Sequence, residues 1–313
     1  PKTHVMQVHF ALPEHKVLEG CALTVGSFDG VHRGHQSLVA RLREEARARN
    51  LPSAALTFWD LPYCFFRPDD CPKLLSPRDE KVAHFAQTGL DFLFVVPFSA
   101  VLAQTDAREF MALLCEKIGV KLFLGGPDFA LGKGRAGTIP QLAEIGKTLG
   151  FEARALEGKL PENGAPISST RCRGVIESGQ VELARQFLGR NYRVSGEVVS
   201  GDKIGRKIGV PTINIAPDAR KCLPKNGVYA VRAHFEGAVF GAALNIGFRP
   251  TVNGKRLQIE FHVLDETIET APQNAEIEFI ARLRDEMRFD GVENLVAQMR
   301  RDFERAREIL KAI

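Results

Sequence analysis

The stretch Ala22-Leu-Thr-Val-Gly-Ser-Phe-Asp-Gly-Val-His-Arg-Gly-His35 decides how the first half of this 313-residue chain folds. Its first residues, Ala22–Val25, form a short apolar run that is typical of a buried strand. A helix is expected over residues 36–50, because apolar side chains recur on one side of it: Leu38, Val39, Leu42 and Ala46. A strand, a glycine-containing loop and a helix in this order predict the first unit of an α/β domain.

The same rhythm continues along the first half of the chain. Further apolar strands are expected over residues 53–58, 92–96 and 121–124, and Pro77 is placed to open a helix at its first position. Continuous apolar strands between helices indicate a parallel sheet that is covered on both faces. Ligands bind such sheets at the C-terminal ends of the strands. Residues 26–35 are therefore expected at the ligand-binding edge.

After about residue 186 the pattern changes to short alternating strands separated by turn residues. These strands are Tyr192–Val199, Val228–Ala233, Ala242–Ile246, Leu257–Val263 and Glu276–Ala281. An amphipathic helix over Val292–Lys311 follows. The pattern predicts a small antiparallel β-barrel with a terminal helix. Two domains are expected, over residues 1–185 and 186–313.

Composition narrows the class of protein. Hydrophobic residues make up 44% and charged residues 26% of the chain, and the net charge is +4. No dense run of Lys and Arg occurs, so we expect no nucleic-acid partner. No apolar run approaches the roughly 20 residues that span a bilayer, and the N-terminus lacks a signal pattern. A cytoplasmic protein without a membrane partner is expected, and its oligomeric state stays open.

The six cysteines, at positions 21, 64, 71, 115, 172 and 222, form no C-x-x-C pair. A zinc site or a redox dithiol is therefore not expected, and the pattern favours free thiols in a reducing compartment.

The loop before the first long helix has the chemistry of an anion site. Its amides and the helix dipole favour a phosphate, and Gly30 and Gly34 allow close approach. His32 and His35 can both donate to phosphate oxygens and stabilise charge on a phosphorus undergoing substitution. A His-x-x-His pair alone is usually structural, but this one lies between a strand and a helix.

A second segment, Ile167-Ser-Ser-Thr-Arg-Cys-Arg173, has hydroxyls that can cap a helix expected over residues 174–188. Arg173 lies one turn on from Ser169. Taken alone, the segment is as well explained by an N-cap and a surface arginine.

The two segments together resemble the Rossmann-like nucleotidylyltransferase superfamily, with its HxGH and ISSTxxR motifs. Residues 126–137, Gly-Pro-Asp-Phe-Ala-Leu-Gly-Lys-Gly-Arg-Ala-Gly, resemble the GxDFxFGxxRxG segment of the flavin-specific branch. The resemblance implies that His32, His35 and Arg173 act on the transition state. It implies an ATP site made of Gly26, Phe28, Asp29, Gly30, His32, His35, Asp128, Arg135, Ser168, Ser169, Thr170 and Arg173.

A second phosphate-handling loop covers residues 201–209, with Lys203, Arg206 and Lys207 available for phosphates. On an extended strand Thr212 and Asn214 point to the same face. Two neutral oxygens there can hold Mg²⁺ beside ATP phosphates.

Glu260 and His262 share one face of the strand over residues 257–263, while Ile259, Phe261 and Val263 share the other. A carboxylate in the mouth of a barrel can take the proton from a primary hydroxyl that attacks a γ-phosphate. A solvated strand carboxylate is the ordinary alternative.

Gly209-Val-Pro-Thr-Ile-Asn214 resembles the GxPTxN motif of riboflavin kinases, and residues 245–251 and 282–289 resemble further segments of that family. The resemblance implies Thr212 and Asn214 as ligands of Mg²⁺ (or Mn²⁺) and Glu260 as the base. Residues 282–289 are expected as a flap over the isoalloxazine ring, with an ordinary turn or helix start as the alternative. The implied ATP and flavin site consists of Gly201, Lys203, Gly205, Arg206, Gly209, Pro211, Thr212, Asn214, Asn245, Arg249, Arg284, Met287 and Phe289.

Nearly the whole chain is thus similar to the prokaryotic bifunctional FAD synthetases, in which a riboflavin kinase is joined to an FMN adenylyltransferase. The resemblance implies that riboflavin and ATP give FMN, and that FMN and a second ATP give FAD and pyrophosphate. Trp59-Asp-Leu61 departs from the TFxPHP-like stretch that is common in the family. We expect altered FMN affinity or rate from this departure. The alternative is a kinase whose N-terminal domain only binds nucleotide, as a regulatory or interaction module.

Overall fold

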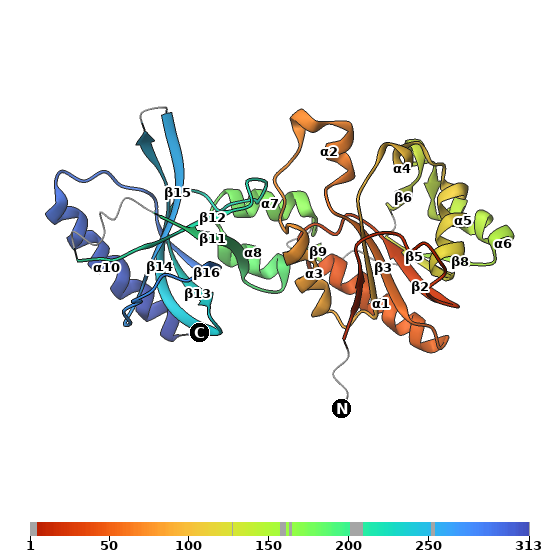
Figure 1. Cartoon of the computed structure of the whole chain (residues 1–313), viewed down its shortest axis with the longest axis horizontal. Coiled ribbons are helices and arrows are strands. Elements are labelled where there is room, and N and C mark those ends of the chain that lie inside the picture. The colour runs from red at the N-terminus through yellow and green to blue at the C-terminus, as the bar shows by residue number, and fades with distance from the viewer. Residues whose placement is uncertain are drawn as a thin grey trace. The chain divides into compact units, whose positions relative to one another are not determined.

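The computed structural model describes residues 5–126, 128–156, 161–162, 165–200, 209–251 and 254–312. The chain divides into two compact units, Pro1–Ser169 and Thr170–Ile313, whose elements are labelled in Figure 1. Helix α8 (Val181–Leu188) and most of α7 (Ser169–Glu177) thus belong to the second unit. Backbone and side-chain bonds explain this: the Arg282 N–H donates to the Glu182 carboxylate at 3.0 Å. The functional boundary at 185/186 stays a prediction.

The first unit is built on a six-stranded parallel sheet in the order β1-β4-β3-β2-β5-β8, which confirms the predicted α/β class. Residues of β2, β3 and most of β4 are buried because helices cover both faces. The strands are β1 (Gln7–His9), β2 (Cys21–Val25), β3 (Ser53–Phe58), β4 (Phe92–Val96), β5 (Val120–Gly125) and β8 (Glu152–Ala155).

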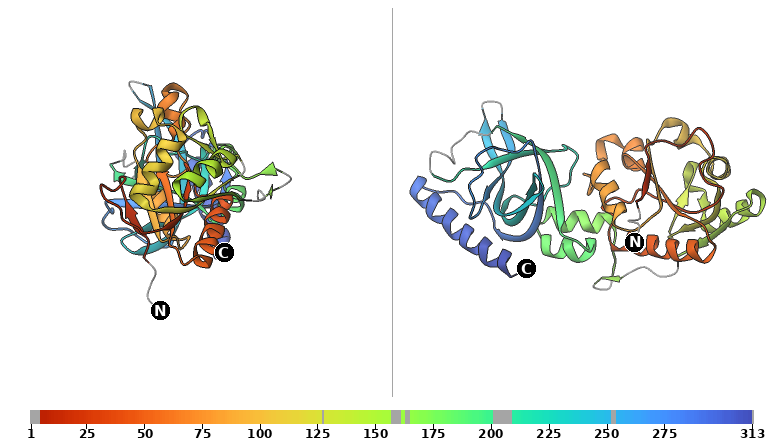
Figure 2. Two further views of the ribbon diagram at one scale, coloured as in Figure 1. Left: turned by 90° about the vertical axis from the view of Figure 1, so that its right-hand side faces the viewer. Right: turned by 60° about the horizontal axis from the view of Figure 1, so that its bottom comes forward.

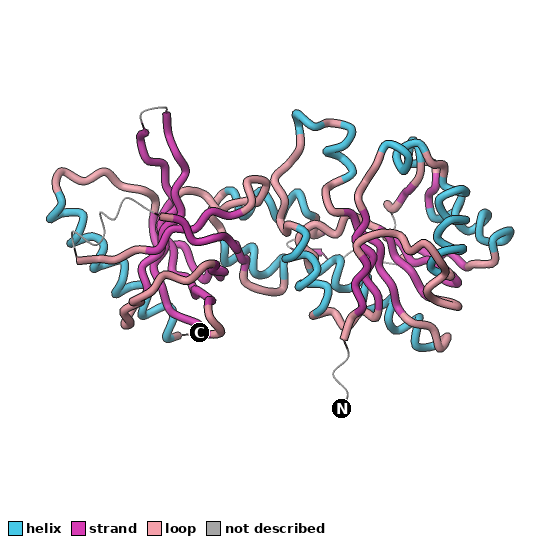
Figure 3. Tube along the Cα trace, viewed as in Figure 1, coloured by secondary structure: helices cyan, strands magenta, loops and turns pink. Residues whose placement is uncertain are grey.

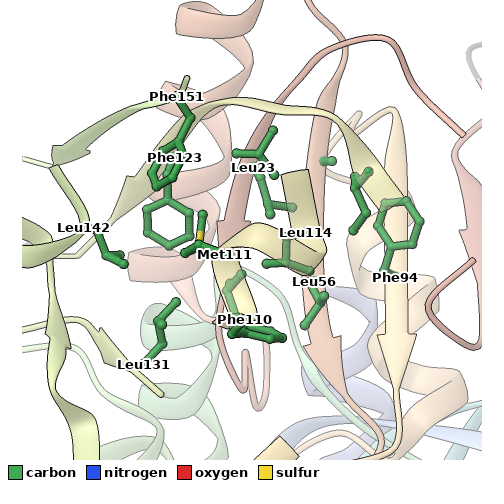
Figure 4. Packing of buried hydrophobic residues seen from close by; sticks show 14 of the residues in the cluster. Leu23, Leu56, Phe94, Phe110, Met111, Leu114, Phe123, Leu131, Leu142 and Phe151 are labelled. Carbon is green, nitrogen blue, oxygen red and sulfur yellow. The ribbon is translucent and has the colours of Figure 1, made fainter. Parts of the chain in front are cut away.

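Alternate strand residues feed two separate cores, one on each face of the sheet. Helices α1 (Arg33–Ala48) and α3 (Arg78–Ala86) place Leu42 and Phe85 in one core. Helices α5 (Ala107–Ile118) and α6 (Ile139–Leu149) cover the other face, and Figure 4 shows their side chains packed on the strands. The predicted two-sided cover is therefore confirmed.

The order of the strands fixes where a ligand site belongs. From β2 the chain moves to β3 and β4 on one side and returns to β5 on the other. The β2–α1 loop, residues 26–32, thus lies at the switch point of the sheet, where ligands of α/β folds bind. The shorter elements of this unit are α2 (Pro62–Phe66), η1 (Pro68–Asp70), α4 (Ala100–Gln104), β6 (Ala130–Leu131), η2 (Lys133–Arg135), β7 (Gly137–Thr138), β9 (Pro161–Glu162) and β10 (Ala165–Pro166).

The second unit is a closed antiparallel barrel in the order β11-β12-β15-β14-β13-β16, with one long helix, α10, packed against it. Figures 2 and 3 show the barrel strands and this helix. The predicted barrel and terminal helix are confirmed. The elements are β11 (Tyr192–Val199), β12 (Ile213–Pro217), β13 (Gly227–Phe235), β14 (Ala238–Thr251), β15 (Gly254–Val263), β16 (Asn274–Arg284) and α10 (Val292–Lys311).

Four local predictions are wrong. Pro77 is the N-cap of α3, which begins at Arg78, and not its first helical residue. The first long helix begins at Arg33, so His35 lies in its first turn. The helix expected over residues 174–188 is two helices, because Gly179 adopts a φ of 81° that ends α7. Cys64 and Cys71 form a disulfide, since the turn through α2 and η1 brings their Cα atoms to 4.7 Å. The other four cysteines are free thiols.

Candidate functional sites

The β2–α1 loop has an unusual backbone. Phe28, Gly30 and Val31 have φ angles of 46°, 80° and 37°, a region that side chains rarely adopt. A Cβ atom on Gly30 would lie 2.8 Å from Leu75 Cδ1, so glycine is required there on two grounds. Strain of this kind persists only where surrounding contacts impose it, and it is concentrated at functional sites.

Asp29 supplies part of that restraint. Its carboxylate accepts hydrogen bonds from the Leu75 N–H at 3.0 Å and the Ser76 N–H at 3.1 Å. The Ser169 hydroxyl donates to the Asp29 carbonyl at 2.9 Å. The loop is therefore tied to two distant segments of the chain, one of which is the first residue of helix α7.

His32 and His35 form one stacked pair, with ring centroids 3.6 Å apart and planes 19° from parallel. Gly34 makes room for this pair, because a Cβ atom there would lie 3.1 Å from His32 Cε1. Burial, and then the neighbouring His32 and Lys81, hold the pKa of His35 well below its usual range. At neutral pH this imidazole is uncharged and can donate one hydrogen bond at a helix N-terminus.

A cavity of 710 Å³ lies at the C-terminal ends of the same strands. Aromatic rings dominate its wall, and Arg135 Nη2 donates to the Asp128 carbonyl at 3.2 Å. The structure thus gathers the predicted Gly26, Asp128 and Arg135 around one space, while His32 and His35 do not line it. The lining includes Gly26, Phe58, Tyr63, Phe66, Asp128 and Arg135.

The departure at residues 59–61 does not line this cavity. The Trp59 indole N–H donates to the Val95 carbonyl at 2.8 Å, and the Arg78 guanidinium stacks 5.3 Å from its ring. Leu61 is buried. The departure therefore acts on how strand β3 leads into α2, whose Tyr63 and Phe66 do line the cavity. Its effect on FMN stays a prediction.

Three further predicted residues follow the loop contact at Ser169. Ser168 precedes α7, and Thr170 and Arg173 lie on that helix, with Thr170 exposed. Arg173 belongs to the second compact unit. Its part in the histidine site stays a prediction.

In the second unit, three strands bring the polar residues of a second site together. Asn214 of β12 and Asn245 of β14 both pair directly with Glu260 of β15, so their side chains share a face. The Thr212 hydroxyl donates to Glu260 Oε2 at 3.3 Å. Gln258 Nε2 donates to Asn214 Oδ1 at 2.5 Å. This cluster combines one carboxylate with four neutral side chains, which come from three separate segments of the sequence.

A cavity of 270 Å³ opens beside Glu260, and its position corrects an expectation. Ile259, Phe261 and Val263 are buried, as the alternation predicts, whereas Glu260 and His262 line the cavity. That side of the barrel wall faces α10, whose Phe303 ring stacks 4.5 Å from the ring of His262. Glu260 therefore lies on the outer face of the barrel, under α10, and not in the barrel mouth.

The segment after β16 forms one wall of this cavity. Met287 and Phe289 line it, and Met287 is 53% exposed. Arg284 donates to both oxygens of Asp302, with its closest contact at 2.7 Å from Nη2 to Oδ2. This partly buried pair fixes the start of the segment to α10. Arg284, Met287 and Phe289 all line this one cavity. Their part in a site and their role as a flap stay predictions.

Sequence reasoning missed several residues of this wall. Gln258, Glu286 and Asp302 all line the cavity. Gln258 and Asp302 also carry hydrogen bonds that position Asn214 and Arg284. The period-2 pattern of β15 places Gln258 on the same face as Glu260, and this signal is enough to find it.

Some predicted kinase residues cannot be placed. Gly201, Lys203, Gly205 and Arg206 lie outside the described residues, as does the side chain of Arg249. Gly209 has a φ of 77°, and the Pro211 carbonyl accepts from His262 Nδ1 at 2.7 Å. Within the described ranges, no helix is long and apolar enough to cross a bilayer.

Comparisons with known proteins agree on both halves. A family model described as riboflavin kinase matches residues 188–310, and one described as FAD synthetase matches residues 14–171. Bifunctional riboflavin kinase/FMN adenylyltransferases from Escherichia coli and Bacillus subtilis are 39% and 34% identical to this chain. The first comparison covers 93% of both chains and the second covers 96% of both. A solved structure named as a macrolide-efflux protein from Streptococcus pneumoniae superposes with a TM-score of 0.87. It is 27% identical, over 97% of this chain and 99% of that one.

Proposed function

Because this chain belongs to the bifunctional riboflavin kinase/FMN adenylyltransferase family, we propose that Glu260 and the paired histidines are the centres of its two reactions. The chain phosphorylates riboflavin to FMN and adenylylates FMN to FAD. The barrel carries the first step and the parallel-sheet unit the second. The cluster of Thr212, Asn214 and Asn245 around Glu260 is the observation that supports the first assignment most.

In the kinase step, Glu260 takes the proton of the ribityl 5′-hydroxyl as that oxygen attacks the γ-phosphorus of ATP, and ADP leaves. Phosphoryl transfer depends chiefly on position and charge, so a carboxylate held by neighbours suits this role. Phe248, Met287 and Phe289 on the cavity wall give the apolar surface that an isoalloxazine ring needs.

Mg²⁺ accompanies ATP in reactions of this kind, and the residues present fit it. Thr212 and Asn214 offer neutral oxygens, and the Thr212 hydroxyl lies 3.3 Å from the Glu260 carboxylate. Mg²⁺ prefers oxygen ligands and usually keeps phosphates and waters in its shell. We assign Thr212 and Asn214 as the residues that would hold the ion, which would neutralise charge on the transferred phosphate.

In the second step, a phosphate oxygen of FMN attacks the α-phosphorus of ATP, the bond to the β-phosphate breaks, and pyrophosphate leaves. His32, His35, Ser169 and Arg173 are assigned to the charge that develops on the phosphorus and the leaving group. The aromatic cavity lined by Phe58, Tyr63 and Phe66 receives the flavin ring. The nucleophile is already ionised near neutral pH, so positioning carries most of this step.

Chromatography of the products tests the proposal. Purified protein is incubated with ATP, Mg²⁺ and either riboflavin or FMN. FAD from both reactions is expected. FMN that accumulates without FAD leaves only the kinase assignment standing. If riboflavin gives neither FMN nor FAD, the kinase assignment is refuted as well.

A further inference from the structure

Lys81 is the most deeply buried lysine near either site, and the two reactions described above assign it no role. Only 1% of its surface is exposed, although lysine is among the residues least often fully buried. It lies on α3, and its ammonium donates to the Phe58 carbonyl at 2.8 Å and to the Ser27 carbonyl at 3.0 Å. One side chain thus ties the β2–α1 loop to the end of strand β3.

The Ser27 carbonyl fixes the orientation of the peptide between Ser27 and Phe28 in that loop. It also accepts from the Thr57 hydroxyl at 3.0 Å. No peptide bond among the described residues is cis, so the N–H that Phe28 contributes to the same peptide points the opposite way. That N–H has no acceptor among the described residues. Holding the Ser27 carbonyl therefore aims a donor away from Lys81, at the start of the residues with positive φ.

The charged groups that face Lys81 come from three other segments. Asp29 in the loop and Asp60 after β3 favour its protonated form, and His35 on α1 feels its charge. Burial outweighs the two carboxylates and lowers the pKa of Lys81 to about 8. Asp60 belongs to the segment that departs from the family pattern, so this departure adds a carboxylate behind the loop.

We infer that Lys81 is a positioning residue for adenylyl transfer, which in its ammonium form holds the β2–α1 loop in the shape that receives the phosphates of ATP. The inference rests on the proposed function of the first unit. In this role Lys81 contacts no reacting atom. It acts through the Ser27 and Phe58 carbonyls, which its three N–H groups can satisfy without help from solvent.

The charge makes the inference testable by pH. An uncharged amine keeps only two N–H groups and loses the charge-assisted bonds, so FAD formation should fall as pH rises through about 8. Stability should move the other way. The pKa of Lys81 is lowered in the folded protein, so between about 8 and 10.5 the unfolded chain binds more protons and the first unit gains stability. A residue that only supports the fold would not couple falling activity to rising stability.

The experiment compares wild type, Lys81→Arg, Lys81→Met and the control Lys117→Met, which also removes a bond to a backbone carbonyl. FAD formation from FMN and FMN formation from riboflavin are measured from pH 6.5 to 9.5. Fluorescence of Trp59, the one tryptophan, follows unfolding of the first unit. We expect kcat for FAD to fall about 10- to 100-fold in Lys81→Met, with the kinase and Lys117→Met unchanged. Lys81→Arg should keep its activity above pH 8.

Two results overturn the inference. One is FAD formation in Lys81→Met within twofold of wild type. The other is a pH profile of FAD formation in Lys81→Arg that is the same as that of wild type. This second comparison remains valid even if Lys81→Met does not fold. Wild type that makes FMN but no FAD refutes the proposed second reaction, and the inference with it.

Discussion

Glu260 is held between two asparagines by strand register and touches a threonine hydroxyl from outside the strands. Its role depends on where the carboxylate lies, not on its being acidic alone. Glu260→Gln keeps the size and hydrogen bonds of the side chain but cannot take a proton. We expect kcat for FMN formation to fall about 10²- to 10⁴-fold, with FAD formation from FMN unchanged.

Glu266→Gln, an exposed carboxylate beyond the end of the same strand, serves as the matched control. Initial rates of both reactions in the two variants decide the matter. Kinase activity in Glu260→Gln close to that of the control would remove Glu260 from the mechanism.

His35 gives a prediction about stability. Its pKa is lowered in the folded protein by burial, so below about pH 6.5 the unfolded chain binds more protons and stability falls as pH falls. One proton accounts for at most about 1.4 kcal/mol per pH unit. Denaturation of the first unit, followed by Trp59 fluorescence at pH 7.5 and 5.5, should show a smaller loss in His35→Gln than in wild type. Equal losses would mean that His35 is protonated without cost.

Single residues also show what can and cannot be predicted from the sequence. The histidine pair, Glu260, Thr212 and Asn214 are predicted from short motifs and from the family resemblance that these motifs carry, because residues a few positions apart have a local geometry. The positive φ angles at Phe28 and Val31, and the burial of Lys81, depend on contacts between segments up to 140 residues apart. No local pattern carries that information.

Among the elements, the turn through α2 and η1 controls the wall of the larger cavity. Its disulfide joins Cys64 to Cys71, and Tyr63 and Phe66 beside it line the cavity. The double variant Cys64→Ser with Cys71→Ser should make the side chains of Tyr63 and Phe66 less ordered. At about 0.5–1.5 kcal/mol for each side chain that must be ordered, KM for FMN should rise several-fold without a change in kcat.

Steady-state kinetics with FMN measures this effect, and wild type treated with a reductant should behave like the double variant. Cys115→Ser, a free thiol on α5, is the control. An unchanged KM in the reduced protein would show that the turn keeps its shape without the bond.

A second element prediction concerns β14. A Cβ atom on Gly247 would overlap the Glu286 carboxylate, which accepts from Asn226 Nδ2 at 3.1 Å. Gly247→Ala should displace the Glu286 carboxylate, break its bond to Asn226 and raise KM for riboflavin several-fold, with little cost in stability because Glu286 is exposed and its side chain is flexible. In Gly241→Ala the nearest atom is the flexible end of Leu310, at 3.1 Å, so this variant should be close to wild type. Equal kinetics for both variants would exclude a role for the Glu286 contact.

The elements were largely predictable. Strands β3, β4 and β11 and helix α10 have the expected bounds, because their apolar periods are strong. The errors occur where one residue or a distant contact determines the local structure. They include the break at Gly179, the earlier start of α1 and the Cys64–Cys71 bond. The closed barrel places Glu260 beneath α10. This position could not be predicted, because the register between three strands cannot be read from the sequence of one strand.

At the scale of the whole molecule, one chain joins two folds that bind ATP in different ways. The parallel-sheet unit offers a helix N-terminus at a switch point, whereas the barrel offers side chains on its outer wall. FMN is the product of one unit and the substrate of the other. Because Glu260 is not among the groups assigned to adenylyl transfer, a defect at Glu260 should leave FAD formation from FMN intact.

The most direct test of this account follows the products of Glu260→Gln and wild type, each started separately from riboflavin and from FMN with ATP and Mg²⁺. Wild type should make FAD from both substrates, and Glu260→Gln should make it from FMN alone. FAD formed from riboflavin by Glu260→Gln at the wild-type rate, or loss of both reactions in that variant while it stays folded, would contradict the account.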